Sequence, residues 1–178
     1  MADELCVINS MYTDAINHDP ATMFIQTGSQ FPGRPAMGAW IDYGLGSENE
    51  NLPAFIVLIT KDRYRQPLYS RLWGNGFLPS QHQGVQFRTG KEPVLYLNNP
   101  PGIQRTDRDA QWKILRQLQS GQAVKYNDPE IEARIAQYEM AFRMQTSVPE
   151  MTDTSDEPEH IYDLYGPESK NSGTFAAN

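Results

Sequence analysis

The stretch from Asn17 to Gly28 constrains the fold of this chain more than any other stretch. Within it, Asp19 suits a helix N-cap, and Pro20 suits the first helical position, where an N–H group is not needed. The glycine at its end suits a helix stop. Residues 5–8, just upstream, form an apolar run that is typical of a buried strand. The sequence therefore predicts a strand, a loop and a helix in immediate succession.

His18 is the leading candidate for a functional side chain, because it lies at the mouth of the predicted helix N-terminus. Free backbone N–H groups and the helix dipole favour an anion there, such as a sulfate or phosphate ester. A neutral imidazole can bind a metal ion, and a protonated imidazole can act as a general acid. The alternative is a structural role, in which the ring only hydrogen-bonds to its own loop.

Arg34 is a second candidate, because it is held between Gly33 and Pro35. Its guanidinium group can donate a pair of hydrogen bonds to the oxygens of an ester group. A surface salt bridge is the alternative use of this side chain. We therefore carry Arg34 forward as a candidate substrate-binding residue.

Residues 1–60 are predicted to begin an α/β core. A short helix is expected over residues 37–45, and the apolar run 54–59 predicts a second buried strand, parallel to the first. Strand, helix, helix and strand in this order open a doubly wound α/β sheet. Residues 151–178 are expected to be an acidic connector, with a short helix over 159–165, that returns to the core.

Residues 61–150 are predicted to form an inserted, mostly helical cap. The first part is rich in turn residues and has only short strand patterns, at 85–87 and 94–97. Two helices, over about 106–119 and 128–146, are expected to pack as an antiparallel pair, because each has an apolar stripe and a polar face.

Composition excludes several classes of protein. A net charge of −7 and an isoelectric point near 4.9 argue against a nucleic-acid-binding protein. Mean hydropathy is −0.61, and no apolar run is long enough to span a bilayer. No signal-like apolar segment precedes the predicted fold. Cys6 is the only cysteine, which excludes an internal disulfide and fits a small buried side chain.

The stretch around His18 resembles a motif of the sulfatase branch of the alkaline-phosphatase superfamily. Pro20, Thr27 and Gly28 stand in the register of that motif, and His18 falls at the position of its nucleophile. The two residues after Pro20 differ from the motif's Ser and Arg. Because position 18 has no thiol or hydroxyl, the formylglycine nucleophile of that branch cannot form here.

Short motifs along the whole chain extend this likeness, at residues 17–20, 26–30, 33–38, 43–49, 76–80, 84–88, 134–139, 143–150 and 173–178. Together they resemble one bacterial sulfatase-like family, a domain-of-unknown-function family of the alkaline-phosphatase superfamily. The resemblance implies a partial alkaline-phosphatase-like sheet with an inserted cap. It also implies that this chain is an internal piece of a longer, exported protein, and that the piece alone is inactive.

The same resemblance implies a metal-dependent hydrolase whose substrate is an anionic ester or a sulfated or phosphorylated saccharide. His18 would be the catalytic residue or a metal ligand, Asp19 would be either a metal ligand or only the helix cap, and Arg34 would bind the substrate. One or more divalent metal ions would complete the site, and this chain alone would not hold them fully. The alternative is a non-catalytic protein that kept the fold and binds a polysaccharide or a surface. Aromatic residues of the cap, such as Trp73 and Phe77, would then stack on a sugar ring or merely pack beneath the cap.

Overall fold

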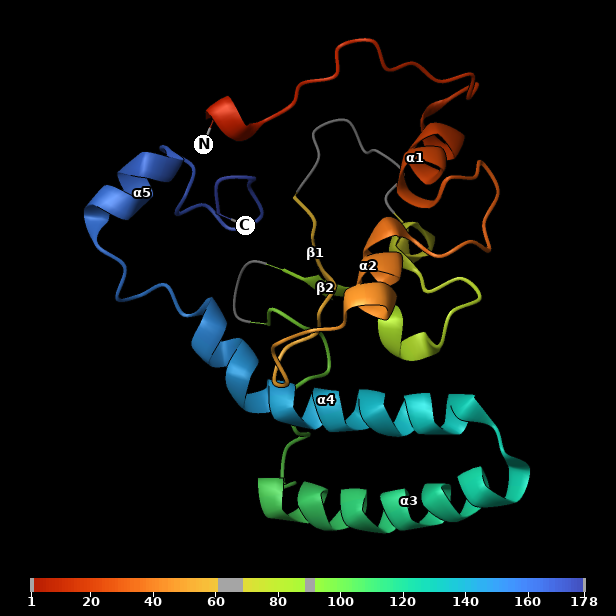
Figure 1. Cartoon of the computed structure of the whole chain (residues 1–178). Coiled ribbons are helices and arrows are strands. Elements are labelled where there is room, and N and C mark those ends of the chain that lie inside the picture. Colours follow the sequence, from red (N-terminus) through yellow and green to blue (C-terminus); the bar gives the residue numbers. More distant parts are fainter. Residues whose placement is uncertain (1, 61–68, 89–91, 178) are drawn as a thin grey trace.

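Ten helices and strands make up the described part of the chain, about half of which is helical (Figure 1). The structure is a computed structural model that describes residues 2–60, 69–88 and 92–177. The α-helices are α1 (His18–Thr27), α2 (Met37–Leu45), α3 (Arg105–Tyr126), α4 (Pro129–Thr152) and α5 (Glu159–Tyr165). The strands are β1 (Ile56–Leu58) and β2 (Val85–Phe87), and the 3-10 helices are η1 (Ala2–Glu4), η2 (Ser70–Trp73) and η3 (Ser80–His82).

The two strands pair in parallel, with Ile56 opposite Val85 and Leu58 opposite Phe87. The N–H of Val85 also donates to the carbonyl of Phe55 at 2.9 Å, so the pairing extends slightly beyond the strand ends. The short strand pattern at 85–87 is thus confirmed, and β1 occupies the centre of the run predicted at 54–59. A mixture of helices and a small parallel sheet is confirmed, and among the described residues the sheet has these two strands alone.

The strand predicted at residues 5–8 is wrong. This segment has no strand structure in the described part of the chain, and its apolar side chains are exposed, as is Cys6. An apolar run becomes a strand only where another strand satisfies its N–H and C=O groups, and no described strand lies beside this one. The pattern at 94–97 is likewise a turn, in which Tyr96 has a φ of +61°.

Helix α4 covers the sheet and completes the core. Phe87 of β2 packs with Met144 and Val148 of α4, and all three are almost fully buried. Partly buried side chains surround this cluster: Leu52, Ile56, Val85, Val94, Leu97 and Met140. Strands expected in two different parts of the chain therefore share one core with α4. The expected boundary between core and cap adjoins residues 61–68, which lie outside the described residues.

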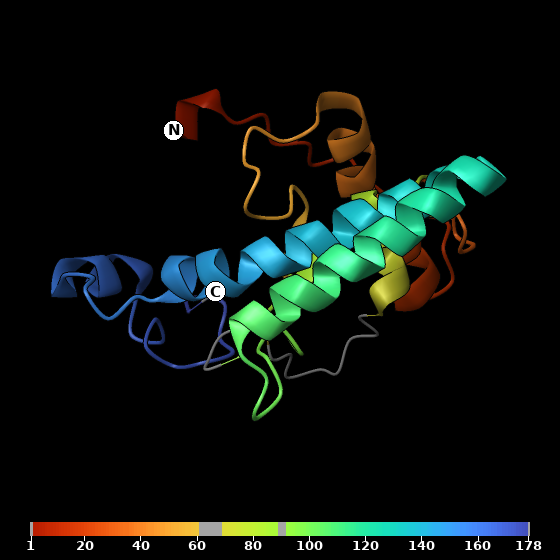
Figure 2. The same ribbon diagram turned by 90° about the horizontal axis from the view of Figure 1, so that it is seen from below.

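Helices α3 and α4 run side by side in opposite directions, which confirms the predicted antiparallel pair (Figures 1 and 2). Arg116 on α3 forms an ion pair with Glu139 on α4, with Nη1 and Oε1 3.1 Å apart. Nearer the start of α3, Arg105 donates to the hydroxyl of Thr146. The contact residues thus advance along one helix while they recede along the other, as an antiparallel pair requires.

The helix ends differ more from prediction than the helix starts. Helices α2 and α5 have the predicted bounds, and α4 begins as expected after Asp128, whose carboxylate accepts from the N–H of Glu130 at 3.0 Å. Helix α3 instead continues past Gly121, and α4 continues through Pro149. A single helical glycine or proline opposes a helix by only about 1–3 kcal/mol. In α4 the burial of Met144 and Val148 beside Pro149 opposes that cost, whereas α3 has no buried residue.

The loops near α1 and α2 are tied together by close backbone contact. Gly76 has a φ of +56°, and a Cβ atom placed on it would lie 2.3 Å from the backbone nitrogen of Pro35. Nearby, the N–H of Ala36 donates to the carbonyl of Gly74 at 3.0 Å. These contacts fix the loop after η2 against the start of α2, and η3 follows directly from it.

Candidate functional site

His18, the leading candidate for a functional side chain, lies at the N-terminus of α1. The helix begins at His18, and its N-cap is Asn17, in an extended conformation with φ −154°. The prediction of Asp19 as the cap is therefore wrong, because the helix starts earlier and Asp19 lies inside its first turn. Gly28 ends the helix in the left-handed conformation with φ +70°, as predicted.

The open end of α1 presents unpaired donors beside an exposed imidazole. Among the described residues, no side chain caps the helix, and His18 itself is exposed. The N–H of Ala21 bonds to the carbonyl of Asn17 at 3.2 Å, and Pro20 has no N–H. Within the described part of the chain, the N–H groups of His18 and Asp19 therefore have no hydrogen-bond acceptor, and they favour a bound anion at the helix end.

Asp19 forms an ion pair with Arg71 of η2, which packs against α1. Its Oδ2 lies 2.5 Å from Nη2 of Arg71, and the two side chains are 40% and 43% exposed. The Arg71 guanidinium also lies over the ring of Tyr69, with its central carbon 4.6 Å from the ring centre. A cation is thus held beside the first turn of α1, close to the residue that follows His18.

The described residues do not complete a metal site. They contain no group of three or more His, Cys, Asp and Glu side chains that could hold a metal ion. Of the two ligands that the resemblance implies, His18 is exposed, whereas one oxygen of Asp19 is committed to Arg71. We therefore derive no chemical step through a metal ion from these side chains.

Arg34 lies apart from this pair. It is exposed in the loop between α1 and α2, and within the described part of the chain it forms no hydrogen bond or ion pair with His18 or Asp19. The structure thus brings His18 and Asp19 together, as consecutive residues, and leaves Arg34 in a separate loop. Substrate binding by Arg34 and a surface salt bridge of Arg34 both remain predictions.

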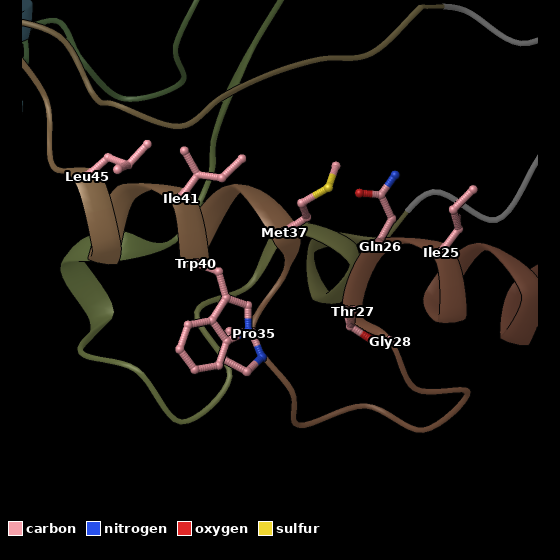
Figure 3. Close-up of a pocket in the computed structure, with 9 residues that line it drawn as sticks. All are labelled: Ile25, Gln26, Thr27, Gly28, Pro35, Met37, Trp40, Ile41 and Leu45. Atoms are coloured by element: carbon pink, nitrogen blue, oxygen red, sulfur yellow. The ribbon is translucent and has the colours of Figure 1, made fainter. Parts of the chain in front are cut away.

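An apolar groove of about 370 Å³ lies between the end of α1 and helix α2 (Figure 3). Figure 3 shows the side chains of Ile25, Met37 and Ile41 pointing to the same side of the two helices. Thr27 also lines the groove, and its hydroxyl donates to the carbonyl of Met23 at 2.9 Å. Thr27 and Gly28 therefore form the C-terminal end of α1. This groove has no charged side chain among its described lining residues.

A His–Asp pair that the sequence does not reveal links α2 to η3. Nδ1 of His82 and Oδ2 of Asp42 are 2.8 Å apart, and their side chains are only 13% and 16% exposed. Helix α4 supports η3, because the side-chain amide of Gln137 donates to the carbonyl of Ser80 at 2.5 Å. Helix α2 thus holds the imidazole through the carboxylate of Asp42, and helix α4 holds η3 through the carbonyl of Ser80.

Aromatic rings surround this pair. Tyr43, next to Asp42 on α2, meets the His82 ring edge to face, with the ring centres 5.4 Å apart. Trp40 contacts both Tyr43 and Phe77, at 6.1 and 5.7 Å between ring centres. The three aromatic side chains are 45–69% exposed, so they form an open aromatic surface beside the pair.

The His82–Asp42 pair escapes prediction because its members are far apart in sequence and lie on different elements. Periodicity places Asp42 on a short helix but does not say which loop packs against it. The one signal available is that Asp42 is the only charged residue in an otherwise apolar helical stretch, 37–45. A charged side chain on a partly buried helix needs a polar partner.

Comparison with known proteins assigns the chain to a family but does not assign an activity. None of the helices in the described part of the chain combines the length and the apolar character needed to cross a membrane. Comparisons with curated proteins and with solved structures found no match. A family described as "Protein of unknown function (DUF1501)" matches residues 1–178. The chain therefore belongs to the DUF1501 family of proteins of unknown function.

Proposed function

We propose that this chain is part of an exported, sulfatase-like or phosphatase-like ester hydrolase with an alkaline-phosphatase-like fold. Within that enzyme, the N-terminus of α1 would bind the anionic group of the ester. The observation that carries the proposal is the exposed His18 at an uncapped helix start, with Arg71 held against the same turn by Asp19. The likeness of the surrounding motif to the sulfatase branch supports the same assignment.

The geometry supports recognition of a tetrahedral oxyanion. Two free backbone N–H groups and the positive end of the helix dipole attract negative charge. A protonated imidazole at His18 adds a donor that can stabilise a leaving oxygen or protonate it. The guanidinium of Arg71 lies beside them and offsets the negative charge of Asp19, which would otherwise repel an anion from the first turn. The proposal also includes a divalent metal ion, whose ligands would have to come from beyond His18 and Asp19, because the described residues contain no group that could hold one.

Binding of inorganic sulfate and phosphate tests the anion site directly. We expect both anions to bind the 178-residue chain in calorimetric titrations, and His18→Ala to weaken binding about three- to tenfold, as expected for loss of one charge-assisted hydrogen bond. His160→Ala is the matched control, because His160 is also exposed but lies on α5. Equal affinities in the parent, His18→Ala and His160→Ala chains would contradict the proposal.

A saccharide-binding protein without catalysis is the second candidate. The exposed aromatic surface of Trp40, Tyr43 and Phe77 favours it, because aromatic faces stack on sugar rings. The two functions can be distinguished in a longer protein that contains this chain, by comparing its parent form with the His18→Ala variant. Loss of aryl sulfate or aryl phosphate turnover in His18→Ala supports the hydrolase. Retention of a polysaccharide by both forms, with turnover in neither, supports the binding protein.

A further inference from the structure

The His82–Asp42 pair lines a second cleft, of about 640 Å³, which is distinct from the α1 site. Residues of α2, η3, β2, the turn at 94–97 and α4 surround it, and none of its described lining residues belongs to α1. Several of its apolar side chains also pack on the core: Leu52, Val85, Val94, Leu97, Met140 and Met144. A volume of this size is typical of sites for small ligands.

The contact with Asp42 orients the His82 ring in this cleft. An ionised carboxylate only accepts hydrogen bonds, so Nδ1 of His82 is the donor to Asp42 and Nε2 is the ring nitrogen left for a ligand; in the tautomer with its hydrogen on Nδ1, Nε2 accepts. The side-chain amide of Gln81 lies 3.2 Å from Nε2 and is placed to donate to it. Gln81 is exposed, so a ligand hydroxyl can take its place without disturbing the core.

The charged residues around the cleft favour an anion. Asp42 is the only acidic residue among the described lining residues, and it is already bound to His82. Arg143 also lines the cleft, and its Nε donates to the carbonyl of Glu50 at 2.6 Å. Arg134 is exposed and has no hydrogen bond or ion pair within the described part of the chain, so its guanidinium is free to bind an anion.

We infer that this cleft binds a small amphipathic anion that also carries a hydroxyl group. The apolar body lies on the floor formed by side chains such as Val94 and Met140. The hydroxyl donates to Nε2 of His82, and the acidic group pairs with Arg134. Asp42 is a positioning residue, because it holds the ring in the tautomer that accepts this hydrogen bond.

Three small aromatic compounds test this arrangement on the folded 178-residue chain. 4-Hydroxyphenylacetate has the hydroxyl, the apolar ring and the carboxylate, whereas phenylacetate lacks the hydroxyl and 4-hydroxyphenethylamine has a cation in place of the anion. In calorimetric titrations we expect 4-hydroxyphenylacetate to bind about tenfold more tightly than phenylacetate, and the amine to bind more weakly still. Equal binding of the three compounds, or no binding of 4-hydroxyphenylacetate, would overturn the inference.

Two variants separate the two polar contacts. His82→Phe keeps a ring against Tyr43 but removes the acceptor, so the two acids should then bind equally. Arg134→Gln changes an exposed side chain, and should weaken both acids about tenfold while it keeps their difference. Lys125→Gln is the control for loss of one positive charge outside the cleft, and it should leave both affinities unchanged. If His82→Phe fails to fold, Arg134→Gln still decides, because unchanged binding in that variant rejects the site.

Discussion

Gly76 is a residue at which one added carbon atom should disturb the tertiary structure. Its φ of +56° disfavours any L side chain, and a Cβ atom would lie 2.3 Å from Pro35 N and 2.4 Å from Arg34 C. Because backbone atoms cannot move aside as a flexible side chain can, we expect Gly76→Ala to lower the free energy of unfolding by about 2–4 kcal/mol. Urea unfolding followed by circular dichroism measures this change.

Gly44 provides the matched control for this substitution. It lies inside α2, and no atom lies within 4 Å of the position that its Cβ atom would take. Gly44→Ala should therefore raise the free energy of unfolding by about 0.5–1 kcal/mol, through helix propensity alone. Similar losses in both variants would show that the close contact between Gly76 and Pro35 does not hold the loops together.

Asp153, at the C-cap of α4, is a residue whose titration the structure predicts. Hydrogen bonds from the side chain and the backbone N–H of Ser155, the latter at 3.0 Å, lower the pKa of the Asp153 carboxyl below its usual value. Since the folded-state pKa is the lower one, the stabilising effect is present above the unfolded-state value and is lost as pH falls through the folded-state value.

Titration of the Asp153 carboxyl carbon by NMR measures this effect. Ser155→Ala removes the hydroxyl donor, so the pKa of Asp153 should rise toward its ordinary value. Ser120→Ala, on the exposed surface of α3, is the control and should leave that titration unchanged. A pKa that stays the same in Ser155→Ala would mean that the hydroxyl does not contact the carboxylate in solution.

At the scale of helices and strands, the contact between β2 and α4 contributes most to the stability of the fold. Phe87 is 2% exposed and packs against Met144 and Val148, so its removal leaves a cavity between the sheet and the helix. We expect Phe87→Ala to lower the free energy of unfolding by about 3–5 kcal/mol, as for other buried Phe residues. Phe175 is 90% exposed, and Phe175→Ala should change stability by less than about 0.5 kcal/mol. Comparable effects of the two substitutions would contradict the described core.

Helix ends were predictable from sequence where a capping residue or a glycine marks them. Asp128 and Pro129 start α4, and Gly28 ends α1, because caps and left-handed glycines act through neighbouring backbone groups. Gly121 and Pro149 suggest ends that the structure does not have. The burial of Val148 next to Pro149 opposes the effect of the proline. Helix α3 has no buried residue, so packing does not explain why it continues past Gly121. Local pattern alone cannot weigh these opposing terms.

Features that depend on partners distant in sequence were not predictable. Residues 5–8 have a strand-like pattern, but the pattern does not specify the neighbouring strand that would satisfy the backbone. The contact of His82 with Asp42 likewise depends on how η3 packs against α2 and α4. In the candidate site, the sequence places His18 near a helix start, but it assigns Asp19 to the cap because Pro20 suggests a later first residue than the structure has. The sequence also does not reveal Arg71 as the partner of Asp19.

At the scale of the whole molecule, the exposed apolar surface at the N-terminal end is the most unusual feature. Six large apolar side chains between residues 5 and 16 are 63–92% exposed: Leu5, Val7, Ile8, Met11, Tyr12 and Ile16. Figure 1 shows this segment running as an extended strip from η1 to α1. Contiguous apolar surface of this kind promotes association between protein molecules.

We therefore expect the chain to self-associate as its concentration rises, and Leu5→Ser, Val7→Ser and Ile8→Ser combined to reduce that association. Because these three side chains are already exposed, the free energy of unfolding should change by less than about 0.5 kcal/mol for each substitution. Sedimentation velocity over a range of concentrations measures the association. Asn9→Ser and Thr13→Ser, in the same segment, are the polar control and should leave association unchanged. A cooperative loss of stability in the triple variant would mean instead that residues 5–8 are buried in solution, as their apolar pattern alone predicts.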